Sequence, residues 1–324
     1  MSFAITLNKI GGPEVLHWEA IHVGHPGPEQ IRLRHTAIGL NFIDIYHRTG
    51  LYAQPLPFVP GVEAAGVIEA IGSNVANLKV GDRVAYALVI GAYSEERLIA
   101  ADRVVKIPDG ISDADAAAMM LKGMTAQYLL RRVHRVTKDD TILVHAAAGG
   151  VGLIMCLWAS HLGATVIGTV STEAKAELAR ANGCTHAITT NNSDFVARVK
   201  EITGGKGLPV VYDSVGRDTF HKSLACLKPR GTMVLFGQAS GAVEPIDPNI
   251  LQRGSLFLTR PTLGTYIASR SDLEETASEL FNVVASGAVK IEVKQRYRLR
   301  DAGLAHRDLE ARKTTGSTVF DVNG

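Results

Sequence analysis

The chain has little cysteine and almost no net charge, and both shortages limit what it can be. Its 324 residues include three cysteines, Cys156, Cys184 and Cys226, which lie far apart. They form neither a CxxC pair nor a disulfide framework, so we expect a reducing compartment and predict a cytoplasmic protein. The formal net charge is only +2. This balance gives no reason to expect a nucleic acid or a membrane surface as the main partner.

Two marks of secreted and membrane proteins are also missing. Residues 1–12 include Asn8 and Lys9 and lack the apolar run of a signal peptide. No residue between Asp140 and Glu173 carries a formal charge, which is long enough to resemble a membrane span. That stretch contains several glycines and has β-rich ends, which favours a buried strand-helix-strand unit. We therefore predict a soluble protein.

The length and a hydrophobic content of 46% allow two domains with sizeable cores. The first 110 residues show short β-rich segments separated by turns. The expected strands are Ala4–Ile10, Gln30–Ile38, Gly66–Ile71, Arg83–Ala87 and Arg97–Ala100. A short helix, Phe42–Arg48, is expected after Asn41, a plausible cap. These segments predict a small barrel or sandwich.

From Ser112 onward, helices and then alternating strands and helices are expected. The first helix is expected to start at Ser112, and a second helix is expected over Met124–Val133. The expected strands are Thr141–Ala146, Thr165–Val170, His186–Thr190, Pro209–Ser214, Thr232–Gly237 and Ser255–Arg260. The expected helices between them are Val151–Leu162, Glu173–Asn182, Asp194–Ile202 and Phe220–Leu227. This alternation predicts a mainly parallel, doubly wound sheet.

The tail of the chain leaves this alternation. A helix over Asp272–Ser286 is followed by a short strand, a helix over Asp301–Arg312 and a final strand, Ser317–Val322. A lone helix and strand would have no core of their own. We therefore expect the tail to pack on the first domain.

Small residues join the strand at Thr141 to the next helix, in the spacing Ala146-x-x-Gly149-x-x-Gly152. A strand that turns through glycines into a helix leaves backbone N–H groups free at the positive end of the helix dipole. In the first such loop of a doubly wound sheet, these groups suit a pyrophosphate. The spacing is a variant of the dinucleotide fingerprint, although small residues also occur where a helix packs closely on a sheet.

The end of the second strand distinguishes NADPH from NADH. An NAD site would place an acid there for the ribose 2′-hydroxyl. Here Ser171 and Thr172 follow the strand, and the first acid, Glu173, already lies in the next helix. Hydroxyls with Lys175 and no acid suit a 2′-phosphate, so we predict NADPH. Alternatively, the two hydroxyls only cap the helix and Lys175 is a solvated charge.

A second motif lies in the first domain, in Pro60–Ile68 (PGVEAAGVI), followed by Gly72 and by Gly81–Val84. Together with the small-residue loop, it resembles the medium-chain dehydrogenase/reductase superfamily, whose first domain is GroES-like. In the zinc alcohol dehydrogenases of that superfamily, a histidine that binds the catalytic zinc precedes the glutamate of this motif. Val62 stands there and cannot coordinate a metal, and three scattered cysteines cannot build a structural zinc site. We therefore predict no metal.

Within the superfamily, the chain resembles the zinc-independent quinone oxidoreductases along nearly its whole length, and the bacterial NADPH:quinone reductases most. The segments that carry this resemblance are Asn41–Tyr46, Arg48–Tyr52, Leu121–Thr125, His145–Gly152, Tyr212–Gly216, Phe236–Gly241 and Arg260–Leu263. It implies an α/β fold with a GroES-like β-rich catalytic domain, residues 1–121 and 268–324. It also implies a doubly wound Rossmann NADPH-binding domain, residues 122–267.

The resemblance also implies roles for individual residues. The catalytic set near the nicotinamide and the quinone entrance is Asn41, Asp44, Tyr46 and Tyr52. The cofactor-binding set is Asn41, Thr125, Tyr128, Ala148, Gly149, Gly150, Val151, Gly152, Ser171, Lys175, Ser214, Gly216, Phe236, Gly237, Ser240, Thr262, Leu263 and Arg312. One departure is Thr190, which stands where close relatives have a tyrosine that helps to frame the adenine.

Several of these side chains also have a purely structural interpretation. Asn41 could be only a helix cap, and Tyr46 and Tyr52 could be half-buried core aromatics. Asp44 could be the salt-bridge partner of Arg48, one turn later on the same helix.

Two further residues have mainly structural interpretations. His145 lies at a strand end, and we expect its ring to be satisfied by structural hydrogen bonds. Cys156 lies on an apolar helix face and is predicted to belong to the core.

The implied function is hydride transfer from C4 of NADPH to a quinone, giving a hydroquinone. A quinone is already a strong acceptor, so positioning, exclusion of water and hydrogen-bond donors such as Tyr46 and Asn41 would be enough. Single-electron transfer is left open. The alternatives are an NADPH-dependent 2-alkenal or enone C=C reductase, and an NADPH-binding protein with a moonlighting contact to RNA. The resemblance also implies a homodimer that pairs through the last Rossmann strand, Ser255–Arg260.

Overall fold

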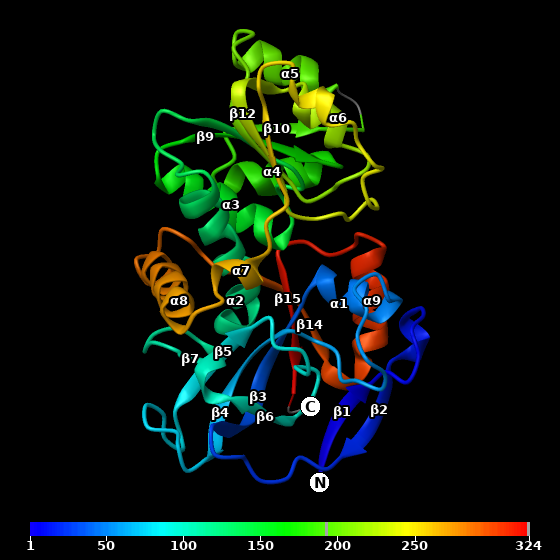
Figure 1. Ribbon diagram of the computed structural model, residues 1–324, viewed down its shortest axis with the longest axis vertical. Coiled ribbons are helices and arrows are strands. Elements are labelled where there is room, and N and C mark those ends of the chain that lie inside the picture. The colour runs from blue at the N-terminus through cyan, green and yellow to red at the C-terminus, as the bar shows by residue number, and fades with distance from the viewer. Residues whose placement is uncertain (192–193, 323–324) are drawn as a thin grey trace. The chain divides into compact units, whose positions relative to one another are not determined.

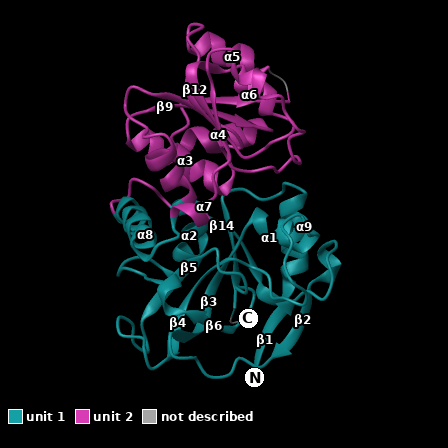
Figure 2. Cartoon of the chain, viewed as in Figure 1, with its two compact units in different colours: residues 1–124, 267–285, 291–324 teal, residues 125–266, 286–290 magenta. Residues whose placement is uncertain are grey.

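The computed structural model of the protein, shown in Figure 1, describes residues 1–191 and 194–322. The chain divides into two compact units, which Figure 2 shows in different colours. Unit 1 comprises residues 1–124, 267–285 and 291–324. Unit 2 comprises residues 125–266 and 286–290.

Unit 1 is rich in strands. These are β1 (Ser2–Thr6), β2 (His17–Ile21), β3 (Gln30–Leu40), β4 (Glu63–Ile71), β5 (Arg83–Ala87), β6 (Glu96–Ala100), β7 (Val105–Lys106), β14 (Val293–Arg298) and β15 (Ser317–Asp321). β1 and β2 form a two-stranded sheet. The others form a sheet with the order β14-β15-β3-β4-β5-β7, in which β6 also pairs with β3. All these pairs are antiparallel except β14 with β15.

The long strand β3 organises unit 1. From Gln30 to Ala37, half-buried residues alternate with buried ones, as expected for a strand with one face on a core, and the remaining residues to Leu40 are all buried. Leu33 of β3 belongs to a cluster with Ile68 of β4, Tyr86 of β5 and Phe320 of β15. The pairing of β15 with β3 confirms that the tail of the chain packs on the first domain.

Unit 1 also contains α-helices. In chain order, they are α1 (Phe42–Thr49), α2 (Asp113–Tyr128), α8 (Arg270–Ala285) and α9 (Ala302–Glu310), with short 3-10 turns at Pro13–Val15, Ala101–Arg103 and Leu299–Asp301. The last four residues of α2, Thr125–Tyr128, already belong to unit 2. Ala302 and Ala305 of α9 lie in the core cluster with Phe320.

Unit 2 alternates parallel strands with helices. Its strands are β8 (Thr141–Val144), β9 (Thr165–Val170), β10 (His186–Thr189), β11 (Leu208–Asp213), β12 (Leu227–Leu235) and β13 (Phe257–Thr259). Its helices are α3 (Gly150–His161), α4 (Glu173–Ala181), α5 (Phe195–Ile202), α6 (Phe220–Leu224) and α7 (Leu263–Tyr266), with a 3-10 turn at Pro248–Leu251.

The strand order in unit 2 is β10-β9-β8-β11-β12-β13, and every pair is parallel. This is the order of a Rossmann sheet, so the predicted doubly wound fold is confirmed. The order reverses between β8 and β11, and ligands bind beside the carboxyl ends of strands at such a point. One face of the sheet, including Leu143 and Val211, packs on Phe195 of α5 and Phe220 of α6.

The prediction of two helices between Ser112 and Val133 was wrong. α2 runs without a break to Tyr128 and continues as a π-helical turn over Leu129–Val133. Gly123 lies within this helix, and a Cβ there would lie 2.5 Å from Leu280 of α8. The glycine therefore serves close helix packing rather than a helix end.

Smaller differences concern exposed segments and element ends. β2 was not expected, since its residues are mostly exposed and show no apolar alternation. β12 begins at Leu227 rather than Thr232. Within the residues that the structure describes, no helix is both long enough and apolar enough to cross a membrane.

Candidate functional site

The loop between β8 and α3 has a backbone shape that its small residues permit. Ala146 adopts a left-handed conformation with φ +52°, and its carbonyl accepts the N–H of Gly149 at 2.9 Å. Gly149 caps α3 from an extended conformation, and its carbonyl accepts the N–H of Leu153. Ala148, between them, is almost fully buried. The loop thus turns directly from the strand into the helix.

Gly152 is the residue that this turn depends on most. A Cβ at this position would lie 2.3 Å from the carbonyl oxygen of Ala146, which no real Cβ contact allows. The first N–H groups of a helix have no carbonyl one turn back, and those of Gly150, Val151 and Gly152 are in this position. With the helix dipole, they suit a pyrophosphate.

A buried hydrogen-bonded network lies beneath this loop. His145 Nδ1 is 2.7 Å from Thr169 Oγ1 at β9, and Nε2 is 2.8 Å from Ser223 Oγ of α6. Ser223 in turn donates to Asp213 Oδ2 at 3.0 Å. Burial lowers the pKa of His145, although Asp213 opposes this shift. The predicted structural role of His145 is confirmed, because both ring nitrogens have partners.

Asp213 shapes the loop that follows β11. Its Oδ1 accepts the N–H groups of Val215 and Gly216 at 2.8 and 3.0 Å. Its Oδ2 accepts the hydroxyls of Thr219 and Ser223. Asp213 was not among the predicted site residues, although an acid that ends a buried strand of a Rossmann sheet is a signal that could have identified it.

The predicted residues Ser214, Gly216, Phe236, Gly237 and Ser240 are brought together in two adjacent loops. A Cβ on Gly237 would lie 2.6 Å from the carbonyl oxygen of Ser214. The N–H and the hydroxyl of Ser240 both donate to the carbonyl of Val215, each at 2.8 Å. Gly216 has φ +90°, a conformation that favours glycine. These two loops therefore pack backbone against backbone beside β11.

The end of β9 has the hydroxyl-rich character expected from the sequence. Thr172 accepts the N–H of Lys175 and so caps α4, which confirms the capping interpretation for Thr172. Ser171 and Lys175 are half-buried. The first acid, Glu173, pairs with Arg180 at 2.8 Å. Thr190 donates through its backbone N–H and its hydroxyl to the carbonyl of Val170, and so lies against this strand end.

The remaining predicted residues of unit 2 lie on α2 and α7. Tyr128 is almost fully buried and stacks on Tyr266, with ring centroids 4.5 Å apart. Burial raises the pKa of Tyr128. Thr125 is half-buried, Leu263 is buried, and Thr262 is exposed with its hydroxyl 3.3 Å from that of Thr265. Their predicted contact with the cofactor stays a prediction.

In unit 1, Asn41 lies between the end of β3 and the start of α1. Its backbone N–H donates to Asp44 Oδ2 at 2.9 Å, and its Nδ2 donates to Glu63 Oε2 at 2.7 Å. Glu63 also accepts the N–H of Leu121 at 2.6 Å, and Lys122 Nζ lies 3.3 Å from its Oε2. Asn41 is therefore both a helix-start residue and a member of a buried charged cluster.

Asp44 lies in the first turn of α1 and is fully buried. Its Oδ2 also accepts the Tyr93 hydroxyl at 2.9 Å, and burial raises the pKa of Asp44 to about 7. The suggested salt bridge with Arg48 was wrong, because Arg48 pairs with Glu310 at 2.6 Å. Arg48 also donates to His306 Nδ1 at 3.2 Å. Complete burial favours a supporting role for Asp44, and its predicted contact with ligands stays a prediction.

Tyr46 of α1 and Tyr52, which follows the helix, are half-buried and form an aromatic edge. Their ring centroids lie 5.1 Å apart in an edge-to-face arrangement, and Phe42 lies 5.5 Å from Tyr46. The N–H of Tyr52 donates to the carbonyl of Tyr46 at 3.1 Å. Arg312, also in unit 1, is exposed in the turn after α9 and has φ +57°.

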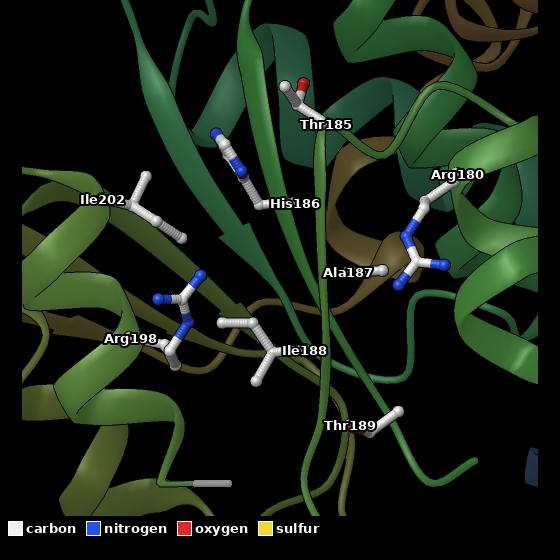
Figure 3. Close-up of a pocket in the computed structure, with 8 residues that line it drawn as sticks. All are labelled: Arg180, Thr185, His186, Ala187, Ile188, Thr189, Arg198 and Ile202. Atoms are coloured by element: carbon white, nitrogen blue, oxygen red, sulfur yellow. The ribbon is translucent and has the colours of Figure 1, made fainter. Parts of the chain in front are cut away.

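A cavity of about 240 Å³ in unit 2 lies along the edge strand β10, as Figure 3 shows. It is lined by Arg180, Thr185, His186, Ala187, Ile188, Thr189, Arg198 and Ile202. Arg180 pairs with Glu173 and Arg198 with Glu201, both on their own helices. None of the residues predicted for catalysis or cofactor binding is among its lining residues.

Two family models match the chain. The alcohol dehydrogenase GroES-like domain matches residues 27–109, and the zinc-binding dehydrogenase domain matches residues 150–282. The chain is 51% identical over 323 residues to a quinone oxidoreductase of Pseudomonas aeruginosa, with 99% of each chain covered. It is 50% identical over 330 residues to a 2-haloacrylate reductase of a Burkholderia species, again with 99% of each covered.

A solved structure of Escherichia coli quinone oxidoreductase complexed with NADPH matches with a TM-score of 0.97 and 48% identity. The match covers 99% of this chain and 100% of the other. The chain belongs to the quinone oxidoreductase family of the medium-chain dehydrogenases/reductases. Its fold is accordingly a GroES-like domain with a Rossmann domain, as predicted.

One family model carries the name of a zinc-binding dehydrogenase, and this family member has Val62 in front of Glu63. Glu63 is engaged with Asn41, Leu121 and Lys122. Among the residues that the structure describes, no group of three or more His, Cys, Asp or Glu side chains could hold a metal ion. The absence of metal from the chemistry stays a prediction.

Proposed function

We propose that this protein is an NADPH-dependent reductase of quinones that works without a metal. The observation that carries the proposal is the start of α3, where Gly152 leaves no room for a Cβ beside the Ala146 carbonyl. This cradle occurs on a fold that matches a quinone oxidoreductase solved with NADPH. The relatives named quinone oxidoreductase support the choice of acceptor.

The residues present fit NADPH. Gly150, Val151 and Gly152 would hold the pyrophosphate through their N–H groups. Ser171 and Lys175 would hold the 2′-phosphate, and the nearest acid, Glu173, is paired with Arg180. Arg312 would reach towards the phosphates. Ser214 and Gly216 would lie on the adenosine side. Phe236, Gly237, Ser240, Thr262 and Leu263 would border the nicotinamide, and Thr125 and Tyr128 would approach the cofactor from α2.

When bound, NADPH supplies the hydride. The rings of Tyr46 and Tyr52, which lie edge to face, would provide an apolar wall for a quinone ring and hydroxyl donors for its oxygens. Asn41 would add an amide held rigidly by Glu63. These groups act by positioning and by hydrogen bonding, which is enough for an acceptor as electrophilic as a quinone.

A second candidate is reduction of an activated C=C bond. It is favoured by the relative named 2-haloacrylate reductase, which is as similar over its whole length as the quinone oxidoreductases are. The same hydride donor and the same donors for a developing oxyanion would serve an enoate or enone. An RNA-binding role has less support, since the formal net charge is only +2.

Steady-state rates separate these candidates. NADPH oxidation is followed with 1,4-benzoquinone, with 2-chloroacrylate and with a 2-alkenal, under anaerobic conditions. We expect kcat/KM to be highest for the quinone; a higher value for 2-chloroacrylate or the alkenal would favour the second candidate. Titration of NADPH fluorescence tests cofactor binding directly, and an unchanged emission spectrum would contradict the cofactor assignment.

We also propose a cytoplasmic homodimer. β13 is an edge strand of the unit 2 sheet, and its Phe257 is 60% exposed. An exposed apolar edge strand favours pairing with a second copy. Light scattering after size exclusion should give twice the chain mass, and Phe257→Lys should lower it. A monomer in the unaltered protein would contradict the proposal.

A further inference from the structure

Glu63 lies at the centre of a buried charged cluster in unit 1. It belongs to neither the predicted catalytic set nor the predicted cofactor-binding set. Its side chain is fully buried. Its Oε1 accepts the Leu121 N–H at 2.6 Å, and its Oε2 accepts the Asn41 Nδ2 at 2.7 Å. Gly39 makes room for it, because a Cβ there would lie 2.4 Å from Glu63 Oε2. The backbone on both sides is thus fitted around this carboxylate.

Lys122 is the counter-ion of this carboxylate. Its Nζ lies 3.3 Å from Glu63 Oε2 and donates to the Leu40 carbonyl at 3.2 Å. Both side chains are almost inaccessible to water. A buried charge persists only when it is paired and hydrogen-bonded, and this pair meets both conditions. Glu63 acts as an acceptor only, because the Leu121 N–H, the Asn41 amide and the Lys122 ammonium all donate to its oxygens.

An acceptor-only neighbour decides how the Asn41 amide is oriented. The two ends of an amide have nearly the same shape, but only the nitrogen can donate to a carboxylate. Nδ2 must therefore face Glu63, which leaves Oδ1 and the second N–H for other partners. The main chain here is also held, since the Asn41 N–H donates to Asp44 and the Leu40 carbonyl accepts from Lys122.

We propose that Glu63, with Lys122 as its counter-ion, is a positioning residue that fixes the orientation of the Asn41 amide. Glu63 touches neither substrate nor cofactor and acts only through Asn41. The consequence for turnover rests on the proposed function, in which Asn41 lies beside the reacting groups. The orientation itself is a property of unit 1 and can be measured without any ligand.

The first experiment uses side-chain amide NMR on ¹⁵N-labelled protein without NADPH. Asn41→Ala identifies the Asn41 signals by their disappearance. The test variant is Glu63→Gln with Lys122→Met, which removes both charges so that neither remains buried alone. We expect the two Nδ2 protons to differ strongly in shift in the unaltered protein, because one is bound to a carboxylate, and to converge in the variant. Unchanged Asn41 signals would overturn the proposal.

The second experiment is a kinetic cycle with a quinone. The Glu63→Gln, Lys122→Met variant should lose about tenfold in kcat, corresponding to about 1.4 kcal/mol. It should lose nothing further when Asn41→Ala is added, because both changes remove the same oriented amide. If the fold-losses in kcat of the charge-pair variant and of Asn41→Ala multiply when combined, Glu63 acts independently of Asn41. That result would overturn the proposal.

A matched control separates positioning from stability. Val62→Ala opens a small cavity next to Glu63 without touching the amide, so it should lower Tm but leave kcat unchanged at 25 °C. A fall in kcat as large as in the charge-pair variant would attribute the loss to local destabilisation and overturn the proposal. If even the unaltered protein reduces no quinone, the proposed function fails, and the NMR comparison alone still decides the orientation.

Discussion

Each unit buries a hydrogen-bonded polar network, and the two networks are completed to different degrees. In unit 2, both oxygens of Asp213 accept two donors each, and both nitrogens of His145 have partners. In unit 1, Asp44 Oδ1 is buried with no hydrogen-bond partner among the described residues, although Oδ2 accepts two donors.

This difference indicates two uses of buried polarity. The network of Asp213 ties three strand ends and α6 together and so fixes the loops proposed to bind the nucleotide. The network of Asp44 supports the start of α1 but leaves one carboxylate oxygen desolvated, which is why its pKa is raised. A buried carboxylate whose oxygens all have hydrogen-bond partners makes the surrounding loops rigid. A buried carboxylate with a raised pKa makes the free energy of unfolding depend on pH.

The largest expected effect comes from breaking the completed network. Asp213→Ala leaves four donors without their acceptor, those of Val215, Gly216, Thr219 and Ser223. We expect unfolding free energy to fall by about 5 kcal/mol, since each buried unsatisfied group costs about 1–3 kcal/mol. Urea unfolding measures the change, and NADPH titration should show a parallel loss of affinity.

Asp213→Asn is the matched control, because it keeps one acceptor oxygen. It should lose clearly less stability than the alanine variant. Equal losses in the two variants would mean that the side-chain volume, and not the acceptors, stabilises the loop.

The second prediction concerns the incomplete network and its pH dependence. The native pKa of Asp44 is about 7, against 3.8 for the ordinary value, so the native state holds this proton more tightly than the unfolded state does. The contribution of Asp44 to stability is therefore present below pH 4 and is lost as pH rises to about 7, by about 4 kcal/mol in total. Asp44→Asn should remove this loss.

The measurement is urea unfolding of both proteins from pH 5 to pH 8. The unfolding free energy of Asp44→Asn should rise relative to that of the unaltered protein as pH rises. The difference between the two should level off above pH 7. His306 has the opposite dependence, because burial lowers its pKa to about 3 and its contribution is lost as pH falls below 6.5. A difference between the two proteins that does not vary with pH would contradict the assignment to Asp44.

A smaller effect is expected at the aromatic edge of unit 1. Tyr46→Phe with Tyr52→Phe keeps both rings and removes only the hydroxyls, so stability should change by less than about 1 kcal/mol. We expect kcat with a quinone to fall by about tenfold, since hydrogen bonding to the developing oxyanion is lost. Unchanged turnover would remove these hydroxyls from the mechanism and leave the rings as a platform only.

The smallest effect is expected at two left-handed residues, one in each unit. Ala146→Gly and Arg312→Gly relieve a strain of about 1 kcal/mol but add a similar amount of unfolded-state entropy, so Tm should hardly change. Arg312→Gly should nevertheless weaken NADPH binding severalfold, because a cation expected to reach towards the phosphates is lost. Titration of NADPH fluorescence measures the change, and an unchanged affinity would contradict that role.

Much of the fold could be predicted from local patterns, because strands and helices alternate with clear periodicity in unit 2. β9 and β5 were predicted with the bounds that the structure gives. The continuous helix α2 was not predicted, since a second helix was expected from Met124. The packing of Gly123 on the distant Leu280 is not encoded in any local pattern. The candidate site shows the same difference between local and distant information. Gly152 could be predicted because it lies within one motif, whereas Asp213 acts through contacts with residues elsewhere in the chain.

The sequence by itself determined the small-residue loop, the lack of an acid directly after β9 and the valine in front of Glu63, because each is a matter of residue type at a fixed spacing. Only the tertiary structure decided that Glu63 faces Asn41, that Asp44 is buried beside Tyr93, and that Arg48 pairs with Glu310. These pairs join residues between 22 and 262 positions apart. Hydrogen bonds and ion pairs over such separations depend on how the elements pack, which no local pattern encodes.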